Sequence, residues 1–213
     1  MSKTIESRAT KSPVAIQKRS DGKAMLVGYG AVFYNPADAG TQYEMWEECY
    51  ERIMPGAFDR ALREMQDVRC LRNHQPDSLL GRVASGTLRL SIDNRGLKYE
   101  CDLPDNTLGN DTKVSLERGD LDGSSFSFQA TRCAWIYESK DGEETSIRQI
   151  EDVDLYDVGP VTFPAYTGAT AGMRSESRAG LEAELIAERS KQRAEADAVD
   201  MAATMARLEC EAD

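Results

Sequence analysis

The sequence predicts a mainly β, α+β fold in which an antiparallel sheet or barrel carries a few helices, followed by a C-terminal helical appendage. Between residues 22 and 173, short apolar stretches are separated by turn signals at close spacing, which is typical of β-structure. Several stretches alternate apolar and polar residues, as half-buried strands do. From residue 174 onward the chain lacks Pro and aromatic residues and is rich in Ala, Glu and Arg, which favours helix.

The first predicted strand is Ala24–Phe33, which ends before the helix- and strand-breaking pair Asn35-Pro36. The segments Arg82–Ile92 and Leu97–Leu103 flank a probable turn at Asp93–Gly96, so together they predict a hairpin.

Two later segments, Ser124–Tyr137 and Ile147–Thr162, predict a second strand pair around the polar loop Glu138–Thr145. Helix is predicted at Gly56–Met65, directly after Pro55, and more weakly at Thr112–Arg118.

Composition divides the chain into three parts. Residues 1–21 carry mostly basic charge, and we expect a flexible arm. Residues 22–173 contain every Tyr, Phe and Trp, and we expect the folded domain there. Residues 174–213 predict an acidic helical tail; their apolar positions keep no strict heptad, so the pattern gives little support to a self-standing coiled coil.

Charge and composition exclude several classes of function. The 213 residues include 26 Lys and Arg against 37 Asp and Glu, a net charge of −11, which disfavours binding to nucleic acid. No apolar run approaches the ~18 residues of a membrane span, and the N-terminus has no signal-peptide core, so we expect a cytosolic protein without a membrane partner. The five cysteines form no CxxC pair, and we expect no metal or organic cofactor.

A pair of hydroxyls stands out in the segment Asp122–Phe128 (DGSSFSF). On a strand, Phe126 and Phe128 would be buried on one face, and Ser125 and Ser127 would share the other. This pattern suits a nucleophile presented from a rigid element, and it also suits an ordinary half-buried strand. It is not a G-x-S-x-G nucleophile elbow, because position 127 is Ser.

A serine nucleophile needs a base, and His74 is the single histidine of the chain. The base in turn needs an acceptor that orients its other ring nitrogen. Candidates are Asp152, Asp154 and Asp157. Asp157 lies between apolar neighbours, where a carboxylate needs a partner, whereas Asp152 and Asp154 lie nearer to the polar loop.

A series of short motifs follows in order along residues 22–170, and together they resemble the prohead maturation proteases of tailed phages of the HK97 type. The motifs are LVGYGAVF (26–33), ERIMPGAF (51–58), the segment 68–74 ending in Asn-His, LGR (80–82), SGTL (85–88), DNRGL (93–97), DLP (102–104), RGDLDGSSFSF (118–128) and DLYDVGPVTFPAY (154–166).

The resemblance implies a serine endopeptidase with the fold of herpesvirus assemblins, an antiparallel β-barrel of about seven strands surrounded by helices. Such a protease acts inside the immature capsid in the host bacterial cytoplasm. Its partners are the major capsid protein or a scaffold protein, whose scaffolding segment it removes, and it often cleaves itself. Homo-oligomers are expected, because relatives of this fold associate.

The site residues that the resemblance implies are His74 as base, Ser125 as nucleophile and Asp157 as acid. The acid in the family pattern is usually Glu and is followed by Ser, where this chain has Asp157 and Gly159. Both differences from the family pattern therefore lie at or near the acid, Asp157, and not at His74 or Ser125. Ser124 is a fallback nucleophile.

Two other functions remain open from the sequence. One is a protease-like domain without activity, kept as a scaffold or assembly chaperone. The other is a thiol enzyme that uses Cys70 or Cys133 with His74, although both cysteines suit burial as small apolar residues. Arg82 and Arg132 could assist catalysis or form surface salt bridges.

Overall fold

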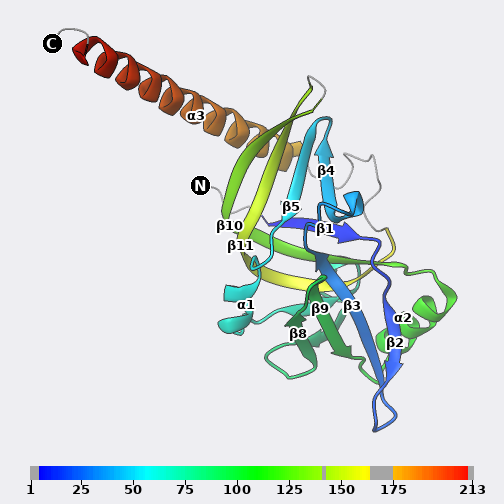
Figure 1. Cartoon of the computed structure of the whole chain (residues 1–213). Helices are drawn as coiled ribbons and strands as arrows, with labels where there is room; N and C mark the ends of the chain where they lie inside the picture. The colour runs from blue at the N-terminus through cyan, green and yellow to red at the C-terminus, as the bar shows by residue number, and fades with distance from the viewer. Residues whose placement is uncertain (1–4, 141–142, 164–174, 211–213) are drawn as a thin grey trace. The chain divides into compact units, whose positions relative to one another are not determined.

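The computed structural model describes residues 5–140, 143–163 and 175–210 (Figure 1). The chain divides into two compact units, Met1–Gly172 and Met173–Asp213. The larger unit is mainly β with a few short helices, as the sequence predicts.

Two sheets make up the larger unit. The first has seven strands, with the path β1-β10-β11-β5-β4 and with β6 and β7 attached through β11. Its strands are β1 (Glu6–Thr10), β4 (Gln42–Trp46), β5 (Cys49–Ile53), β6 (Arg69–Leu71), β7 (Leu79–Arg82), β10 (Gly123–Lys140) and β11 (Glu143–Val161). The second has four strands in the order β2-β3-β9-β8. These are β2 (Ala15–Lys18), β3 (Ala24–Val32), β8 (Leu88–Ile92) and β9 (Gly96–Asp102).

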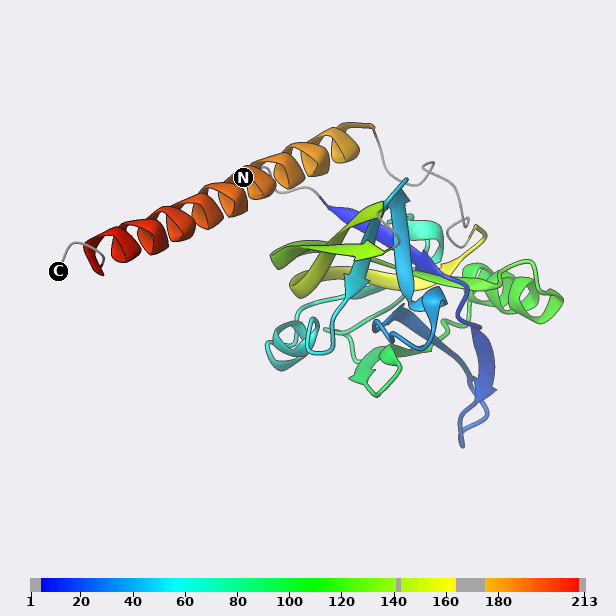
Figure 2. The same cartoon turned by 45° about the horizontal axis from the view of Figure 1, so that its top comes forward.

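The helices of this unit are short: η1 (Ala39–Thr41), α1 (Asp59–Arg63), η2 (Arg72–His74) and α2 (Thr107–Arg118). The helix expected at Gly56–Met65 is confined to α1, because the residues before Asp59 form a turn in which Gly56 has φ 93°. Helix α2 begins earlier than expected because the Asn106 side chain caps it by accepting from the Gly109 N–H. In both views α1 and α2 lie at opposite ends of the unit (Figures 1 and 2).

The predicted strand pairs are present. Strands β8 and β9 form the first hairpin, and β10 and β11 form the second. The segment expected as a polar loop at Glu138–Thr145 is largely strand, since β10 reaches Lys140 and β11 starts at Glu143. Figure 1 shows β10 and β11 running side by side as a long, curved pair.

The structure does not support the closed antiparallel barrel that was expected. Within the described residues the main path of the larger sheet ends at β1 and β4, and the smaller sheet ends at β2 and β8. Strands β5 and β6 pair with β11 in parallel, not antiparallel, at different points along its length. Alternating apolar and polar residues predict strands and their faces but do not specify which strands pair. The order of the strands in the two sheets could therefore not be predicted from this alternation.

A single apolar core joins the two sheets. It includes Leu26 and Tyr99 from the smaller sheet and Phe126, Phe128 and Val158 from the larger one, all fully buried. The Phe126 and Phe128 rings stack with centroids 4.9 Å apart. This packing fixes the inward face of β10, and therefore also the identity of the residues on its outward face.

The N-terminal segment differs from the flexible arm that was expected over residues 1–21. Strand β1 pairs antiparallel with β10, and β2 pairs with β3. Two of the charged residues that suggested a solvated arm, Glu6 and Arg8, are buried. Composition did not reveal their partners, which lie far away in the sequence.

Those partners form a buried ionic cluster of two carboxylates and two guanidinium groups. Arg8 Nε donates to Glu51 Oε1 at 2.7 Å, and Arg8 Nη2 donates to Glu6 Oε2 at 2.7 Å. Arg148 Nη1 donates to Glu6 Oε2 at 2.8 Å and to Glu51 Oε2 at 2.9 Å. The cluster joins β1 to β5 and β11, and Arg8 lies opposite the buried Phe126 in the sheet register.

The cluster keeps Glu51 ionised although its side chain has no exposed surface. Burial alone would raise the pKa of Glu51, but attraction to Arg8 and Arg148 outweighs burial and lowers that pKa below its usual value. Burial would likewise lower the pKa of Arg8, yet Glu51 and Glu6 hold it above its usual value. The charges are thus mutually dependent, and removing one leaves others buried without compensation.

The smaller unit contains α3 (Ser175–Cys210), which lies in the segment where the composition predicts helix. Its apolar side chains Ile186, Val199 and Met201 are exposed. In the part of the chain that the structure describes, no helix combines the length and apolar character needed to cross a membrane.

We predict that Glu51→Gln lowers the free energy of unfolding by about 3–5 kcal/mol, because Arg8 and Arg148 then remain buried with too little negative charge. Urea denaturation at neutral pH measures this loss. Glu117→Gln is the matched control, since Glu117 is 54% exposed and its 3.8 Å ion pair with Lys113 contributes at most about 1 kcal/mol. Equal effects of the two substitutions would contradict the prediction.

The same cluster predicts a pH dependence of stability. A carboxylate with a lowered folded pKa stabilises the fold above its unfolded pKa, and this contribution disappears as the pH falls through the folded value. The free energy of unfolding of the wild-type protein should therefore fall in acid as Glu51 is protonated. Glu51→Gln lacks this contribution at every pH, so this part of the pH dependence should be absent.

Candidate active site

Strand β10 presents two serines on the face opposite its phenylalanines, as the alternation predicts. Ser125 is 2% exposed and Ser127 is 4% exposed. In the register with β11, Ser125 lies opposite Gly159 and Ser127 lies opposite Asp157. The serines, the glycine and the acid therefore share one face of the sheet.

His74 lies over this face at the end of the single turn η2, which connects β6 to β7. Its Nε2 atom is 2.6 Å from Ser125 Oγ, and its Nδ1 atom is 2.6 Å from Asp157 Oδ1. The three residues singled out from the sequence are thus in direct contact. In the tautomer that carries its proton on Nδ1, that nitrogen donates to the Asp157 carboxylate and Nε2 offers its lone pair to the serine hydroxyl.

The shorter acid of this chain reaches the imidazole without an intervening water. Strand β6 runs parallel to β11 beside Asp157 and Val158, which brings the turn close to the acid. Gly159 permits this approach, because a Cβ atom at that position would lie 2.0 Å from the Leu71 carbonyl oxygen. A serine at position 159 would therefore not fit this backbone.

Ser127 is a further polar contact of the imidazole. Its Oγ atom is 2.9 Å from His74 Nδ1 and 2.8 Å from Ser7 Oγ. The Nδ1 proton therefore has two oxygen atoms within reach, those of Asp157 and Ser127. The alternation along β10 placed Ser127 beside Ser125, but it did not indicate this contact.

The main chain of β1 supplies a contact that sequence reasoning missed. Ser125 Oγ donates to the Arg8 carbonyl oxygen at 2.8 Å, and Ala9 lies opposite Ser125 in the sheet register. The single proton of the hydroxyl thus has two acceptors, the carbonyl and His74 Nε2. Every residue has a backbone carbonyl, so the sequence alone does not indicate this contact. Only the pairing of β1 with β10 could have predicted that the Arg8 carbonyl lies next to Ser125.

The alternative residues lie elsewhere. Ser124 is fully buried on the opposite face, where its Oγ is 2.7 Å from the Tyr99 hydroxyl. Asp152 and Asp154 both accept hydrogen bonds from Arg60, each at 2.8 Å.

The cysteine and arginine candidates have other surroundings. Cys70 is fully buried, and a hydrogen bond with Cys101, together with burial, raises the pKa of its thiol well above the usual value. Cys133 lies on β10 opposite Ile150. The candidate helpers form ion pairs on the surface, Arg82 with Asp67 and Arg132 with Glu151.

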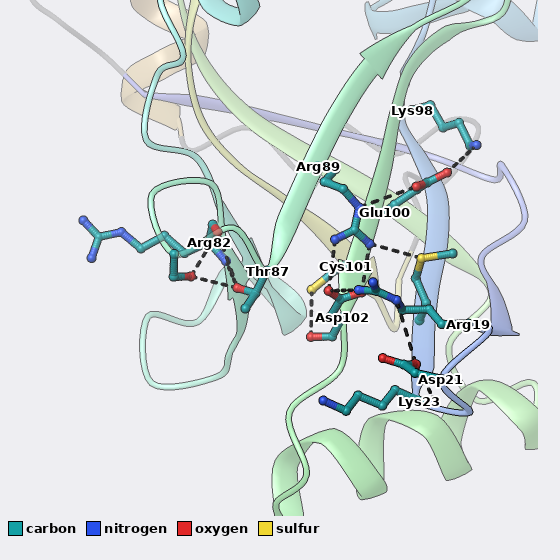
Figure 3. A network of polar contacts seen from close by, with 12 residues as sticks. Arg19, Asp21, Lys23, Arg82, Thr87, Arg89, Lys98, Glu100, Cys101 and Asp102 are labelled. Carbon is teal, nitrogen blue, oxygen red and sulfur yellow. Dashed lines mark hydrogen bonds and ion pairs between the residues drawn. The ribbon is translucent and has the colours of Figure 1, made fainter.

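A groove of about 1100 Å³ lies between the β2–β3 hairpin, β7 and α2, and its lining contains none of the three site residues. Beside it, Arg19 and Arg89 converge on Asp102, with the Arg19 bond at 2.6 Å and an Arg89 bond at 2.8 Å (Figure 3). Two of the acids that line the groove, Asp21 and Asp102, thus form ion pairs with Arg19. Among the described residues, no group of three or more His, Cys, Asp or Glu side chains is arranged to hold a metal ion.

Chemically, the arrangement at His74 can activate a hydroxyl. A neutral imidazole in contact with a serine can take the hydroxyl proton, and a carboxylate on the other ring nitrogen favours the tautomer that does so. The contacts are partly shielded from water, since 25% of the His74 side chain and 11% of the Asp157 side chain are exposed.

A family profile and a solved structure both match this chain. The profile of a family described as caudovirus prohead serine protease matches residues 12–183. Among solved structures, the bacteriophage T4 capsid assembly protease matches with 10% sequence identity and a TM-score of 0.44, over 74% of this chain and 96% of that chain. No curated protein sequence matches the chain. Because the profile covers most of the chain, this protein belongs to the prohead serine proteases of tailed phages, which are serine proteases of capsid maturation.

Proposed function

We propose that the chain is a serine endopeptidase that removes the scaffolding segment of the major capsid protein, or a separate scaffold protein, inside the immature capsid. Ser125 is the nucleophile, His74 is the general base and acid, and Asp157 orients His74. The observation that carries this assignment is the pair of 2.6 Å contacts that the two nitrogens of His74 make with Ser125 and Asp157.

In the proposed reaction, Ser125 Oγ attacks the scissile carbonyl carbon while its proton passes to His74 Nε2. Asp157 stabilises the imidazolium that forms. The tetrahedral intermediate collapses, the carbon–nitrogen bond breaks, and Nε2 returns the proton to the departing amine. Water then attacks the acyl-enzyme with the help of the same imidazole, which restores the Ser125 hydroxyl.

Membership of the family supports capsid or scaffold protein as substrate and the interior of the immature capsid, in the host cytoplasm, as the place of action. We further propose that the protease forms homo-oligomers and that it cleaves itself. We also propose that the larger unit, Met1–Gly172, which includes β1 and β2, is the protease domain and that residues 174–213 form a helical appendage. A catalytically inactive scaffold role remains the competing function.

The decisive test of this function is co-expression of the protease with its capsid and scaffold proteins, read by intact mass. We predict truncated capsid or scaffold protein with wild type and none with Ser125→Ala, because no other hydroxyl contacts His74 Nε2 in the described structure. Ser124→Ala is the matched control, since it removes the neighbouring hydroxyl on the opposite face and should keep cleavage. If the capsid and scaffold proteins have identical masses with wild type and with Ser125→Ala, the protease function is wrong and the inactive scaffold role is favoured.

We predict that Asp157→Asn lowers kcat by roughly 10³-fold or more, because an amide can donate to Nδ1 and hold the wrong imidazole tautomer. Asp152→Asn is the matched control, since Asp152 lies on the same strand but binds Arg60. Kinetics on a peptide that spans the mapped cleavage site measure both. A similar loss for both substitutions would show that Asp157 has no special role.

We predict that Ser127→Ala lowers kcat about tenfold, because Nδ1 loses one of its two oxygen contacts and keeps the one from Asp157. Ser7→Ala should have a smaller effect, since Ser7 contacts Ser127 and not the imidazole. Unchanged kcat in Ser127→Ala, or a loss as large as in Ser125→Ala, would refute this role.

A further inference from the structure

The turn that carries His74 has an unusual backbone. Asn73 and His74 are consecutive residues with φ 55°, in the left-handed region that residues with side chains seldom occupy. Asparagine tolerates this conformation better than most residues. Two such residues in succession need support from their surroundings to persist.

The internal hydrogen bonds of the turn close it without attaching it to the acid-bearing strand. The Gln75 N–H donates to the Arg72 carbonyl at 3.1 Å, and the Arg72 N–H donates to the Ser78 carbonyl at 3.1 Å. Strand β6, which leads into the turn, pairs with β11 at only two register positions, opposite Asp157 and Val158. Apart from the contacts of His74 itself and the packing of Leu71 on Gly159, the described hydrogen bonds give the turn one more connection to β11 and the residue after it.

The side chain of Asn73 makes that connection. Its Oδ1 atom accepts from the Thr162 N–H at 2.8 Å, and its Nδ2 atom donates to Thr162 Oγ1 at 3.1 Å. Thr162 directly follows the last residue of β11, the strand that carries Asp157. The amide thus clamps the residue before His74 to the strand of its acid, through two bonds that together fix both distance and orientation.

We propose that Asn73 is a positioning residue for the reaction: its two bonds to Thr162 set the imidazole of His74 between Ser125 and Asp157. This inference rests on the proposed roles of those three residues. Asn73 itself is not required to touch the reacting atoms. Placement matters because a displacement of about 1 Å can cost 10²-fold in rate.

The test separates the clamp from the backbone conformation. Asn73→Gly removes both bonds but adopts the left-handed conformation freely, so backbone strain does not increase. Thr162→Val removes the hydroxyl acceptor and keeps the N–H donor, whereas Thr162→Ser keeps both groups and is the conservative control. Because Asn73→Gly and Thr162→Val both remove the Nδ2–Oγ1 bond, the double substitution should cost less than the sum of the two.

The first readout is the split between kcat and KM on a peptide that spans the mapped cleavage site. We expect kcat to fall at least tenfold in Asn73→Gly and several-fold in Thr162→Val, with KM within twofold of wild type. Thr162→Ser should restore wild-type kcat. Wild-type kcat in Asn73→Gly would overturn the proposal, and so would a change confined to KM.

The second readout is the tautomer of the imidazole. His74 is the only histidine, so ¹⁵N-histidine labelling of the full chain yields signals from a single ring. We expect the Nδ1–H tautomer in wild type and Thr162→Ser, and a mixture with the Nε2–H tautomer in Asn73→Gly. An unchanged tautomer in folded Asn73→Gly protein would overturn the positioning role, because a merely structural loss lowers the melting temperature and leaves the tautomer as it was.

Failure of the inference is distinguishable from failure of the proposed function. If wild type and Ser125→Ala behave alike toward capsid and scaffold proteins, the proposed function is wrong, whatever Asn73→Gly does. If wild type cleaves and Ser125→Ala does not, but Asn73→Gly matches wild type in kcat and tautomer, only the clamp is refuted.

Discussion

The antiparallel register between β10 and β11 is the constraint on which the remaining features of the site depend. The buried Phe126 and Phe128 fix which face of β10 turns inward, and successive side chains alternate, so Ser125 and Ser127 must face outward. The register then places Asp157 opposite Ser127. A slip of one residue would exchange the two faces and separate the serines from the acid.

Two further segments complete the site, and each reaches it through a different kind of interaction. Strand β1 is held by buried charges, so Arg8 contributes both its guanidinium to the ionic cluster and its carbonyl to Ser125. The turn that carries His74 is held by close backbone packing, which the absence of a side chain at Gly159 permits. Both segments are therefore fixed to the larger sheet, β1 through its buried charges and the turn through its packing against β11.

Most of the site could be predicted from the sequence, because its side chains follow simple rules. Alternation placed Ser125 on an outward face, and a single histidine left one choice of base. The contacts of Arg8 and Asn73 could not be predicted, since one involves a carbonyl that every residue has and the other an amide whose partner is distant in sequence.

The fold was predicted less completely than the site, for a related reason. The long hairpins had clear alternation, whereas β6 has only three residues and gives no periodic signal. Strand β1 was assigned to an arm because residues 1–21 are predominantly basic. The neutralisation of Arg8 by Glu51 and of Glu6 by Arg148 is visible only in three dimensions. Whether the strands close into a barrel depends on which strands pair. Alternating residues show which face of a strand is buried but not which strand lies beside it.

The spread of the site along the chain has a consequence for when activity can arise. Strand β1 lies at Glu6–Thr10, whereas its partner β10 starts at Gly123 and the acid-bearing β11 ends at Val161. Pairings between such distant segments form late, because the loop between them must first be closed. During synthesis, a ribosome must therefore complete nearly the whole larger unit before the serine, the imidazole and the carboxylate can meet. If these three residues catalyse the reaction as proposed, a nascent chain is inert toward the proteins made beside it until the larger unit has folded.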